Sequence, residues 1–229
     1  MARPEAPSPS HAGTPGEGRQ PAGWREKLGL YLICDLGLAG GRDPVQLVEL
    51  ALAAGVRAVQ LRAKATPDRV AYQVALALRR VTARYGALLI VNDRLDLALA
   101  AGADGVHLGQ DDLPAEVARR LWPAGLLGVS VRTAERARAA ERAGADYLGA
   151  GALRSTSTKP DSRVIGLEGL RAVVQATRLP VVAIGGIRPE DVPAVRQIGA
   201  AGVAVASAIL QAEDVRGAAK AFLTALTTT

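Results

Sequence analysis

The sequence predicts an α/β protein, a (β/α)8 TIM barrel made of a single domain with a disordered N-terminal tail. From Leu28 onward, short apolar runs alternate with longer segments of helical period, eight times in succession. The length of 229 residues suits one such barrel. Apolar residues make up 49% of the chain, which is enough for a large core without disulfides. A doubly wound open sheet is the alternative, but no GxGxxG motif follows the first apolar run.

The N-terminal segment has a different composition from the rest of the chain. Met1–Gly23 is rich in Pro, Gly, Ser and Ala and has few large apolar residues. Such a segment cannot bury enough surface to offset its ordering entropy. We therefore predict a flexible tail over residues 1–25 and a barrel catalytic domain over residues 26–229. We also expect that deleting Met1–Gly23 leaves activity unchanged.

Eight apolar, often β-branched runs are the predicted strands. They are Leu30–Cys34, Ala58–Leu61, Leu88–Val91, Gly105–Leu108, Leu126–Val129, Tyr147–Gly149, Val181–Ile184 and Val203–Ala206. The segments of helical period between and after them, several of which open with proline, are Pro44–Ala54, Pro67–Tyr85, Leu95–Ala101, Pro114–Leu121, Thr133–Ala143, Leu167–Ala176, Pro189–Ile198 and Asp214–Leu226. Strict alternation implies a parallel sheet, and closing that sheet gives the barrel.

Four turns that join a helix to the next strand share a small-residue pattern. Gly55, Gly102, Gly144 and Gly199 sit where a left-handed residue ends a helix. These turns lie at the bottom of a barrel, away from the active-site end. The aspartates in them are therefore expected to be structural.

The composition argues against a nucleic-acid partner despite the formal charge of +6 and a pI near 10. Lys and Arg are scattered over predicted helices and interleaved with Asp and Glu. Aromatic residues are only 3% of the chain, too few for a surface that stacks single-stranded bases. We expect phosphorylated small molecules as ligands and no nucleic acid.

The lone cysteine and the hydropathy pattern bear on location. Cys34 lies inside an apolar run, where a single cysteine is typically a small buried hydrophobe. No apolar run reaches transmembrane length and no signal-peptide core is present. We expect a cytoplasmic protein without a membrane partner. The oligomeric state stays open, a homo-oligomer included.

Two neighbouring strands are followed by carboxylates. Asp93 comes directly after the third predicted strand, and Asp111 and Asp112 follow the fourth. Because parallel strands end at the same edge, Asp93 and Asp112 should project into one mouth. Oxygen ligands with room for water and substrate phosphates suit Mg²⁺. The alternative for each aspartate is a helix cap.

Other polar groups occupy the same predicted edge. They are Gln60, Arg62, Lys64, Asn92, Ser130, the run Ser155–Lys159, the Gly185-Gly186 pair and the Ala206-Ser207 pair. Loops after the seventh and eighth strands commonly bind phosphate in this fold. Arg62 and Lys64 could equally be rim cations, and His107, within a strand, reads as a wall residue. Together these groups predict that the mouth holds two anions, one bound at a metal ion and one bound by backbone amides.

The order of these motifs resembles the thiamine phosphate synthase family from about Leu30 to Ile209. The resemblance rests on VNDRLDLALAAGADGVHLGQDDLP and TSTK above all, supported by YLICD, QLRAK, LGVS, GADYLGAG, GLEGL, VVAIGGI and GVAVASAI. It implies a transferase of thiamine biosynthesis. Such enzymes join 4-amino-5-hydroxymethyl-2-methylpyrimidine diphosphate to a thiazole phosphate, often its carboxylate. The products are thiamine phosphate and pyrophosphate.

The resemblance also implies roles for individual residues. It places Mg²⁺ on Asp93 and Asp112. It assigns the pyrimidine diphosphate to Gln60, Arg62, Lys64, Asn92, Ser130 and Lys159, of which Arg62, Ser130 and Lys159 are the expected catalytic residues. It assigns the thiazole phosphate to Thr156, Thr158, Gly186, Ala206 and Ser207. The implied route is a metal-assisted dissociative displacement that needs no protein nucleophile.

Two departures from the family pattern stand out. Ala63 replaces the acidic residue of the usual QLREK, and Ala152–Ser155 replaces a stretch that usually carries two prolines. Strand alternation should turn Ala63 away from Arg62 and Lys64. Fewer prolines should loosen the sixth loop. The competing functions are a thiazole tautomerase paralogue, which needs no diphosphate-holding metal, and a non-catalytic phosphate-binding barrel.

Overall fold

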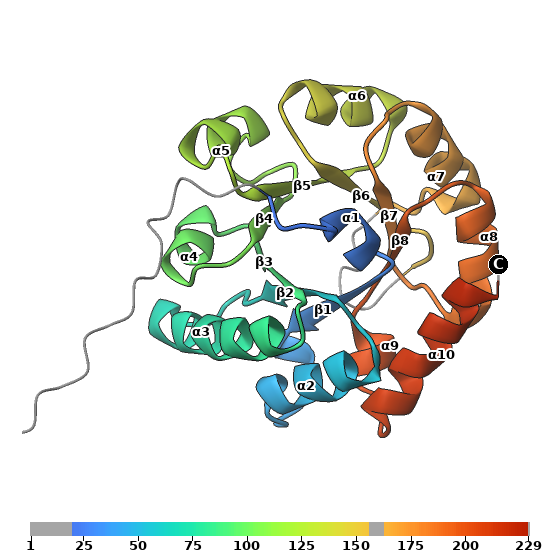
Figure 1. Cartoon of the computed structure of the whole chain (residues 1–229). Coiled ribbons are helices and arrows are strands. Elements are labelled where there is room, and N and C mark those ends of the chain that lie inside the picture. The colour runs from blue at the N-terminus through green and yellow to red at the C-terminus, as the bar shows by residue number, and fades with distance from the viewer. Residues whose placement is uncertain (1–19, 156–162, 229) are drawn as a thin grey trace, which may run out of the picture.

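The computed structural model describes residues 20–155 and 163–228. Within them eight parallel strands, paired in sequence order and then back from the last to the first, form a closed barrel (Figure 1). The strands are β1 (Leu30–Asp35), β2 (Ala58–Arg62), β3 (Leu88–Asn92), β4 (Gly105–Leu108), β5 (Leu126–Val131), β6 (Tyr147–Gly151), β7 (Val181–Ile184) and β8 (Gly202–Val205). The predicted fold class is confirmed, and all eight strands form where the apolar runs predicted them.

Helices surround the barrel on the outside (Figure 1). They are α1 (Trp24–Lys27), α2 (Pro44–Ala54), α3 (Asp68–Arg84), α4 (Leu95–Ala100), α5 (Ala115–Leu121), α6 (Ala134–Arg142), α7 (Gly166–Gln175), α8 (Val192–Gln197), α9 (Ser207–Leu210) and α10 (Val215–Thr227), with 3-10 turns η1 (Leu36–Leu38) and η2 (Pro189–Asp191). No helix in the described ranges has the length and apolar character needed to cross a membrane.

One predicted helix is divided in the structure. The segment 189–198 forms η2 and then α8 rather than one continuous helix. Pro193 lies in the first turn of α8 and has no N–H to bond back into η2, so a new helix starts there. The two shortest helices, α1 and α9, were not predicted, because a helix of four residues is too short to show a helical period in the sequence.

The apolar residues divide into two shells. An outer shell packs the strands against the helices and includes Leu32, Cys34 and Leu61, while an inner shell fills the barrel and includes Tyr31 and Ile33. Successive residues of β1 thus point alternately outward and inward, as the period of a strand requires. Cys34 is a free, buried thiol in the outer shell, as predicted.

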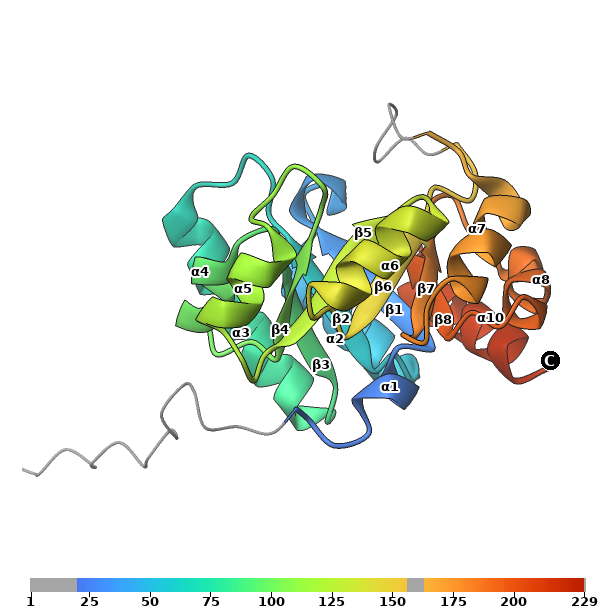
Figure 2. The same ribbon diagram turned by 90° about the horizontal axis from the view of Figure 1, so that it is seen from above.

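The bottom of the barrel is closed by α1, which lies where the strands begin (Figure 2). Trp24 is 7% exposed and belongs to the inner shell, with its ring 6.5 Å from that of Tyr147. Nearby, the Gln20 amide donates to Asp146 Oδ1 at 2.6 Å. The predicted tail extended to residue 25, but Gln20 and Trp24 pack against the barrel. The packed part of the chain therefore includes residues that composition assigned to the tail.

The turns beneath the barrel confirm their structural assignment. Gly102 and Gly144 have φ values of 61° and 88°, the left-handed conformation predicted for them. The Asp104 carboxylate accepts the backbone N–H of Leu89 at 2.8 Å, and Asp146 accepts that of Leu127 at 2.8 Å. Each aspartate therefore ties its own turn to a neighbouring strand.

Candidate active site

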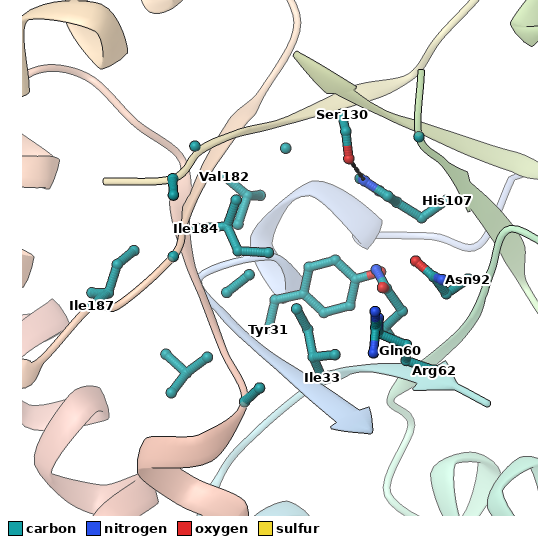
Figure 3. Close-up of a pocket in the computed structure, with 18 of the residues that line it drawn as sticks. Tyr31, Ile33, Gln60, Arg62, Asn92, His107, Ser130, Val182, Ile184 and Ile187 are labelled. Carbon is teal, nitrogen blue, oxygen red and sulfur yellow. Dashed lines mark hydrogen bonds between the residues drawn. The ribbon is translucent and has the colours of Figure 1, made fainter. Parts of the chain in front are cut away.

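A cavity of about 300 Å³ opens at the carboxyl ends of the strands (Figure 3). It brings together every described residue that the sequence assigned to the site. These are Gln60, Arg62, Lys64, Asn92, Asp93, Asp112, Ser130, Gly186, Ala206 and Ser207. Thr156, Thr158 and Lys159 lie outside the described residues. The described residues that we predicted to meet at the strand ends therefore line one cavity.

Asp93 lines the mouth and has a strained backbone conformation. It follows β3 with φ at 63°, a left-handed value that side chains rarely adopt, and its backbone N–H donates to the carbonyl of His107 at 2.8 Å. It does not cap a helix, because α4 begins at Leu95 without a side-chain cap. Its Oδ2 atom is buried and accepts no hydrogen bond from a described residue, although the Lys64 ammonium contacts it.

The second carboxylate, Asp112, lies beside the first. Its Oδ2 atom accepts the backbone N–H of Gly109 at 2.6 Å, so it braces its own loop rather than a helix. Burial, and after it the neighbouring Asp93 carboxylate, raises the pKa of Asp112 above its usual value. Two carboxyl groups held this close in a partly buried site favour a cation between them.

The donor set fits Mg²⁺. Asp93 offers a buried oxygen in contact with the Lys64 ammonium, and Asp112 supplies a second carboxylate. Among residues 20–155 and 163–228, no cluster of three or more His, Cys, Asp or Glu side chains converges. Mg²⁺ commonly binds through one or two carboxylates and completes its shell with water and substrate phosphates. Asp93 and Asp112 would hold the metal in this way.

The two predicted cations are paired with carboxylates. Arg62, at the end of β2, forms an ion pair with Asp35 at the end of β1, and the strand register sets these two residues side by side. Lys64 pairs with Asp93. Asp35 is 5% exposed and was not singled out from the sequence, although the motif YLICD contains it. It holds the Arg62 guanidinium at the mouth.

A chain of hydrogen bonds runs through the interior below the mouth. Gln60 Nε2 donates to Tyr31 Oη at 2.9 Å, and the Tyr31 and Tyr147 hydroxyls lie 3.0 Å apart. His107 continues the chain, with Nδ1 3.2 Å from Tyr147 Oη and Nε2 3.0 Å from Ser130 Oγ (Figure 3). Burial raises the pKa of both tyrosines, so both hydroxyls stay protonated.

This chain joins residues that sequence reasoning treated separately. His107 was predicted to be a wall residue, and it lines the cavity with its ring nitrogens bonded. Tyr31 and Tyr147 were not singled out. Their inward direction could have been read from the alternation along β1 and β6, but their contact depends on closure of the barrel.

The turn after β7 packs tightly against the loop after β6. Gly185 and Gly186 have φ values of 97° and 66°. A Cβ atom at Gly185 would lie 2.6 Å from the Ala152 Cβ, and one at Gly186 would lie 2.9 Å from the Arg154 Cβ. Glycine is therefore required there by conformation and by space.

The described start of the sixth loop is bonded to the turn after β7, while the part of the loop from 156 to 162 lies outside the described residues, so the expectation of a looser loop stays a prediction. The backbone N–H groups of Leu153 and Arg154 donate to the carbonyls of Ile184 and Gly185 at 2.8 and 2.9 Å. The Arg154 guanidinium forms an ion pair with Asp191, which is 9% exposed. This ion pair links the sixth and seventh loops. Ala63, as predicted, packs outward against the outer shell.

These features define a class of protein. A closed parallel barrel that gathers carboxylates, cations and a glycine turn at the carboxyl ends of its strands is an enzyme scaffold for anionic, phosphorylated ligands.

Comparison with known proteins gives the family. The sequence profile of a family described as thiamine monophosphate synthase matches residues 30–209. The thiamine-phosphate synthase of Pyrococcus furiosus is 49% identical over 194 residues, 85% of this chain and 92% of that protein. The thiamine-phosphate synthase of Moorella thermoacetica is 50% identical over 193 residues, 83% and 92% of the two chains. The chain therefore belongs to the thiamine phosphate synthase family, a family of transferases, as its motifs predicted.

A solved structure agrees with this assignment. The thiamine phosphate pyrophosphorylase from Pyrococcus furiosus superimposes with a TM-score of 0.83 at 46% identity. The match covers 89% of this chain and 98% of that one. The likeness extends over the whole barrel, so the strand ends that form the site are included in it.

Proposed function

We propose that this chain condenses 4-amino-5-hydroxymethyl-2-methylpyrimidine diphosphate with a thiazole phosphate, giving thiamine phosphate and pyrophosphate. The observation that supports this most strongly is the Asp93–Asp112 carboxylate pair with Lys64 beside it in one mouth. The names of the family and of the relatives point to the same product. A reaction that releases diphosphate needs such a cluster of metal ligands and cations.

The pyrimidine diphosphate is assigned to the half of the mouth formed by β2 to β5. Arg62 and Lys64 would bind phosphoryl oxygens, while Gln60 and Asn92 would meet the ring. Ser130, whose hydroxyl lies 3.0 Å from His107 Nε2, would bind the diphosphate. Lys159 is assigned the same role from the family motif.

The chemistry follows from charge placement. Mg²⁺, when bound by Asp93 and Asp112, supplies neutralisation of the charge that develops on the leaving diphosphate. Arg62 and Lys64 add to that neutralisation, which favours cleavage of the carbon–oxygen bond. The aminopyrimidine stabilises the methylene carbocation that remains, and the thiazole nitrogen attacks it. The protein's part is therefore positioning and electrostatics, without a covalent nucleophile.

The thiazole phosphate is assigned to the other half of the mouth. Gly186 and Ser207 follow β7 and β8, and both line the cavity with Ala206. The backbone there can approach a phosphate closely. Thr156 and Thr158 would add hydroxyl donors by the family motif. The two ligands would thus meet above the interior of the barrel.

The test is product formation that depends on both substrates. Purified protein with Mg²⁺ should release pyrophosphate and form thiamine phosphate only when the pyrimidine diphosphate and the thiazole phosphate are both present. Isomerisation of the thiazole phosphate without pyrophosphate release would assign the chain to a tautomerase instead. Binding of both ligands without any product would indicate a non-catalytic barrel.

A further inference from the structure

Three cationic side chains line the described part of the cavity, and they differ in how they are compensated. Arg62 pairs with Asp35 and Lys64 pairs with Asp93. Arg132 lines the same cavity, yet within residues 20–155 and 163–228 it has neither a hydrogen bond nor an ion pair. Asp111, the exposed carboxylate of the same cavity, forms no ion pair with it.

The course of β5 explains why Arg132 faces the cavity. This strand runs to Val131, two residues beyond the predicted end. Ser130 points inward to His107, and Val131 is 1% exposed in the outer shell. Alternation then directs Arg132 to the same side as Ser130. The side chain is half-buried there.

The location also indicates which anion Arg132 would meet. Gln110 Nε2 donates to the Ser130 carbonyl at 2.5 Å, so the loop after β4 contacts the end of β5 beside Arg132. The loop after β4 carries Asp112, and Ser130 is proposed to bind the diphosphate. Gly186 and Ser207, the proposed thiazole phosphate residues, follow β7 and β8 further round the barrel.

The charges of the other cavity residues also favour the diphosphate as the anion that Arg132 would bind. The carboxylates of Asp93 and Asp112 match the two charges of Mg²⁺, and Asp35 matches Arg62. An incoming diphosphate would then find little uncompensated positive charge among the described residues apart from Lys64 and Arg132. A half-buried guanidinium without a partner is stabilised by an anion that accepts its hydrogen bonds.

We propose that Arg132 is a further diphosphate-binding residue, which holds the pyrophosphate group of the pyrimidine substrate and of the product. This inference rests on the proposed function and deepens it. It adds a cation from β5 to the groups that the family motif identifies.

The experiment measures inorganic pyrophosphate binding in the presence of Mg²⁺, by calorimetry at constant ionic strength. Arg132→Met should weaken binding by about ten- to a hundred-fold, the usual effect of losing a charge-assisted contact. Arg132→Lys should recover part of the loss. The matched control is Arg136→Met, which removes an exposed arginine from α6 that does not line the cavity.

Steady-state kinetics separates the two anions. The KM for the pyrimidine diphosphate should rise in Arg132→Met, while the KM for the thiazole phosphate stays the same. Equal pyrophosphate affinity in wild type and Arg132→Met would overturn the inference and leave the proposed function standing, as would a rise confined to the thiazole KM. Wild-type protein that binds no pyrophosphate with Mg²⁺ would overturn both.

Discussion

Lys64 and Asp93 form an ion pair in which the lysine ammonium contacts the buried Oδ2 atom of Asp93. The ammonium therefore stands next to the position proposed for the metal. When Mg²⁺ and a diphosphate bind together, Lys64 can turn from the carboxylate to a phosphoryl oxygen. On the proposed function, Lys64 and the metal would compete for Asp93 in the free protein and would act together in the complex.

This relationship predicts opposite effects for one substitution. Lys64→Met should tighten the binding of Mn²⁺ alone, measured by electron paramagnetic resonance, because the carboxylates lose their competing cation. The same variant should bind pyrophosphate more weakly and turn over more slowly, since a phosphate ligand is lost. Lys220→Met, on α10 and outside the cavity, is the control. Weaker Mn²⁺ binding in Lys64→Met would show that Lys64 does not compete with the metal.

The hydroxyl chain inside the barrel predicts a stability loss. Tyr147→Phe keeps the ring but removes the group that bonds the Tyr31 hydroxyl and His107. Leaving buried polar groups with fewer partners costs about 1–3 kcal/mol. Urea unfolding should show that decrease, whereas Tyr72→Phe, at a partly exposed position on α3, should change stability by less than about 0.5 kcal/mol. Equal stabilities of the two variants would mean that the chain contributes nothing.

The Arg154–Asp191 ion pair predicts an effect confined to one substrate. Arg154→Met removes the link between the sixth and seventh loops near Gly186, so the KM for the thiazole phosphate should rise by a few-fold to tenfold. The KM for the pyrimidine diphosphate should stay the same. Arg188→Met removes a cation of the seventh loop whose partner, Glu190, is exposed and 3.8 Å away, and it should leave both constants unchanged. A parallel rise of both constants in Arg154→Met would argue for a general loss of structure.

Cys34 provides a prediction on pH. Burial, together with the nearby Asp35 and Asp43 charges, raises the pKa of the thiol from 9.0 to about 12. A group with a raised pKa contributes stability that is present below its unfolded value and lost as pH rises toward the folded value. The unfolding free energy of the wild type should therefore fall more steeply between pH 9 and 12 than that of Cys34→Ala. Parallel pH dependences would contradict the burial of the thiol.

Trp24 predicts where truncation becomes harmful. Trp24→Ala should lower the unfolding free energy by about 3–5 kcal/mol, because the ring fills the bottom of the inner shell. Deletion of Met1–Gly23 keeps Trp24 and should leave turnover unchanged, although it removes the Gln20 contact with Asp146. Loss of turnover on that deletion would give the N-terminal segment a role in the reaction.

Some features of this barrel and its site could be predicted from the sequence, and others could not. The barrel was predictable because strand and helix periods are local, and closure follows from strict alternation. The proximity of Asp93 and Asp112 was predictable because each follows a strand, and parallel strands have their carboxyl ends at the same edge of the sheet. Trp24 was not, since it stands in a Pro- and Gly-rich segment and its burial depends on the barrel above it.

The interior contacts of the site depend on chain closure rather than on local pattern. Tyr31 and Tyr147 are 116 residues apart and meet only because β1 and β6 face each other across the barrel. The Asp35–Arg62 pair depends on the register of β1 and β2. Arg132 was not predicted as a site residue because the predicted strand ends at Val129, whereas β5 continues to Val131.

The Asp93–Asp112 pair is proposed to make this mouth a metal-dependent condensing site. The most direct measurement compares thiamine phosphate formation by the wild type and by Asp93→Asn over a range of Mg²⁺ concentrations. The wild type should form product only with the metal, and the variant, with an unchanged circular dichroism spectrum, should lose at least about tenfold in turnover at limiting Mg²⁺. Equal turnover of the two proteins, or product formed without any divalent cation, would contradict the account.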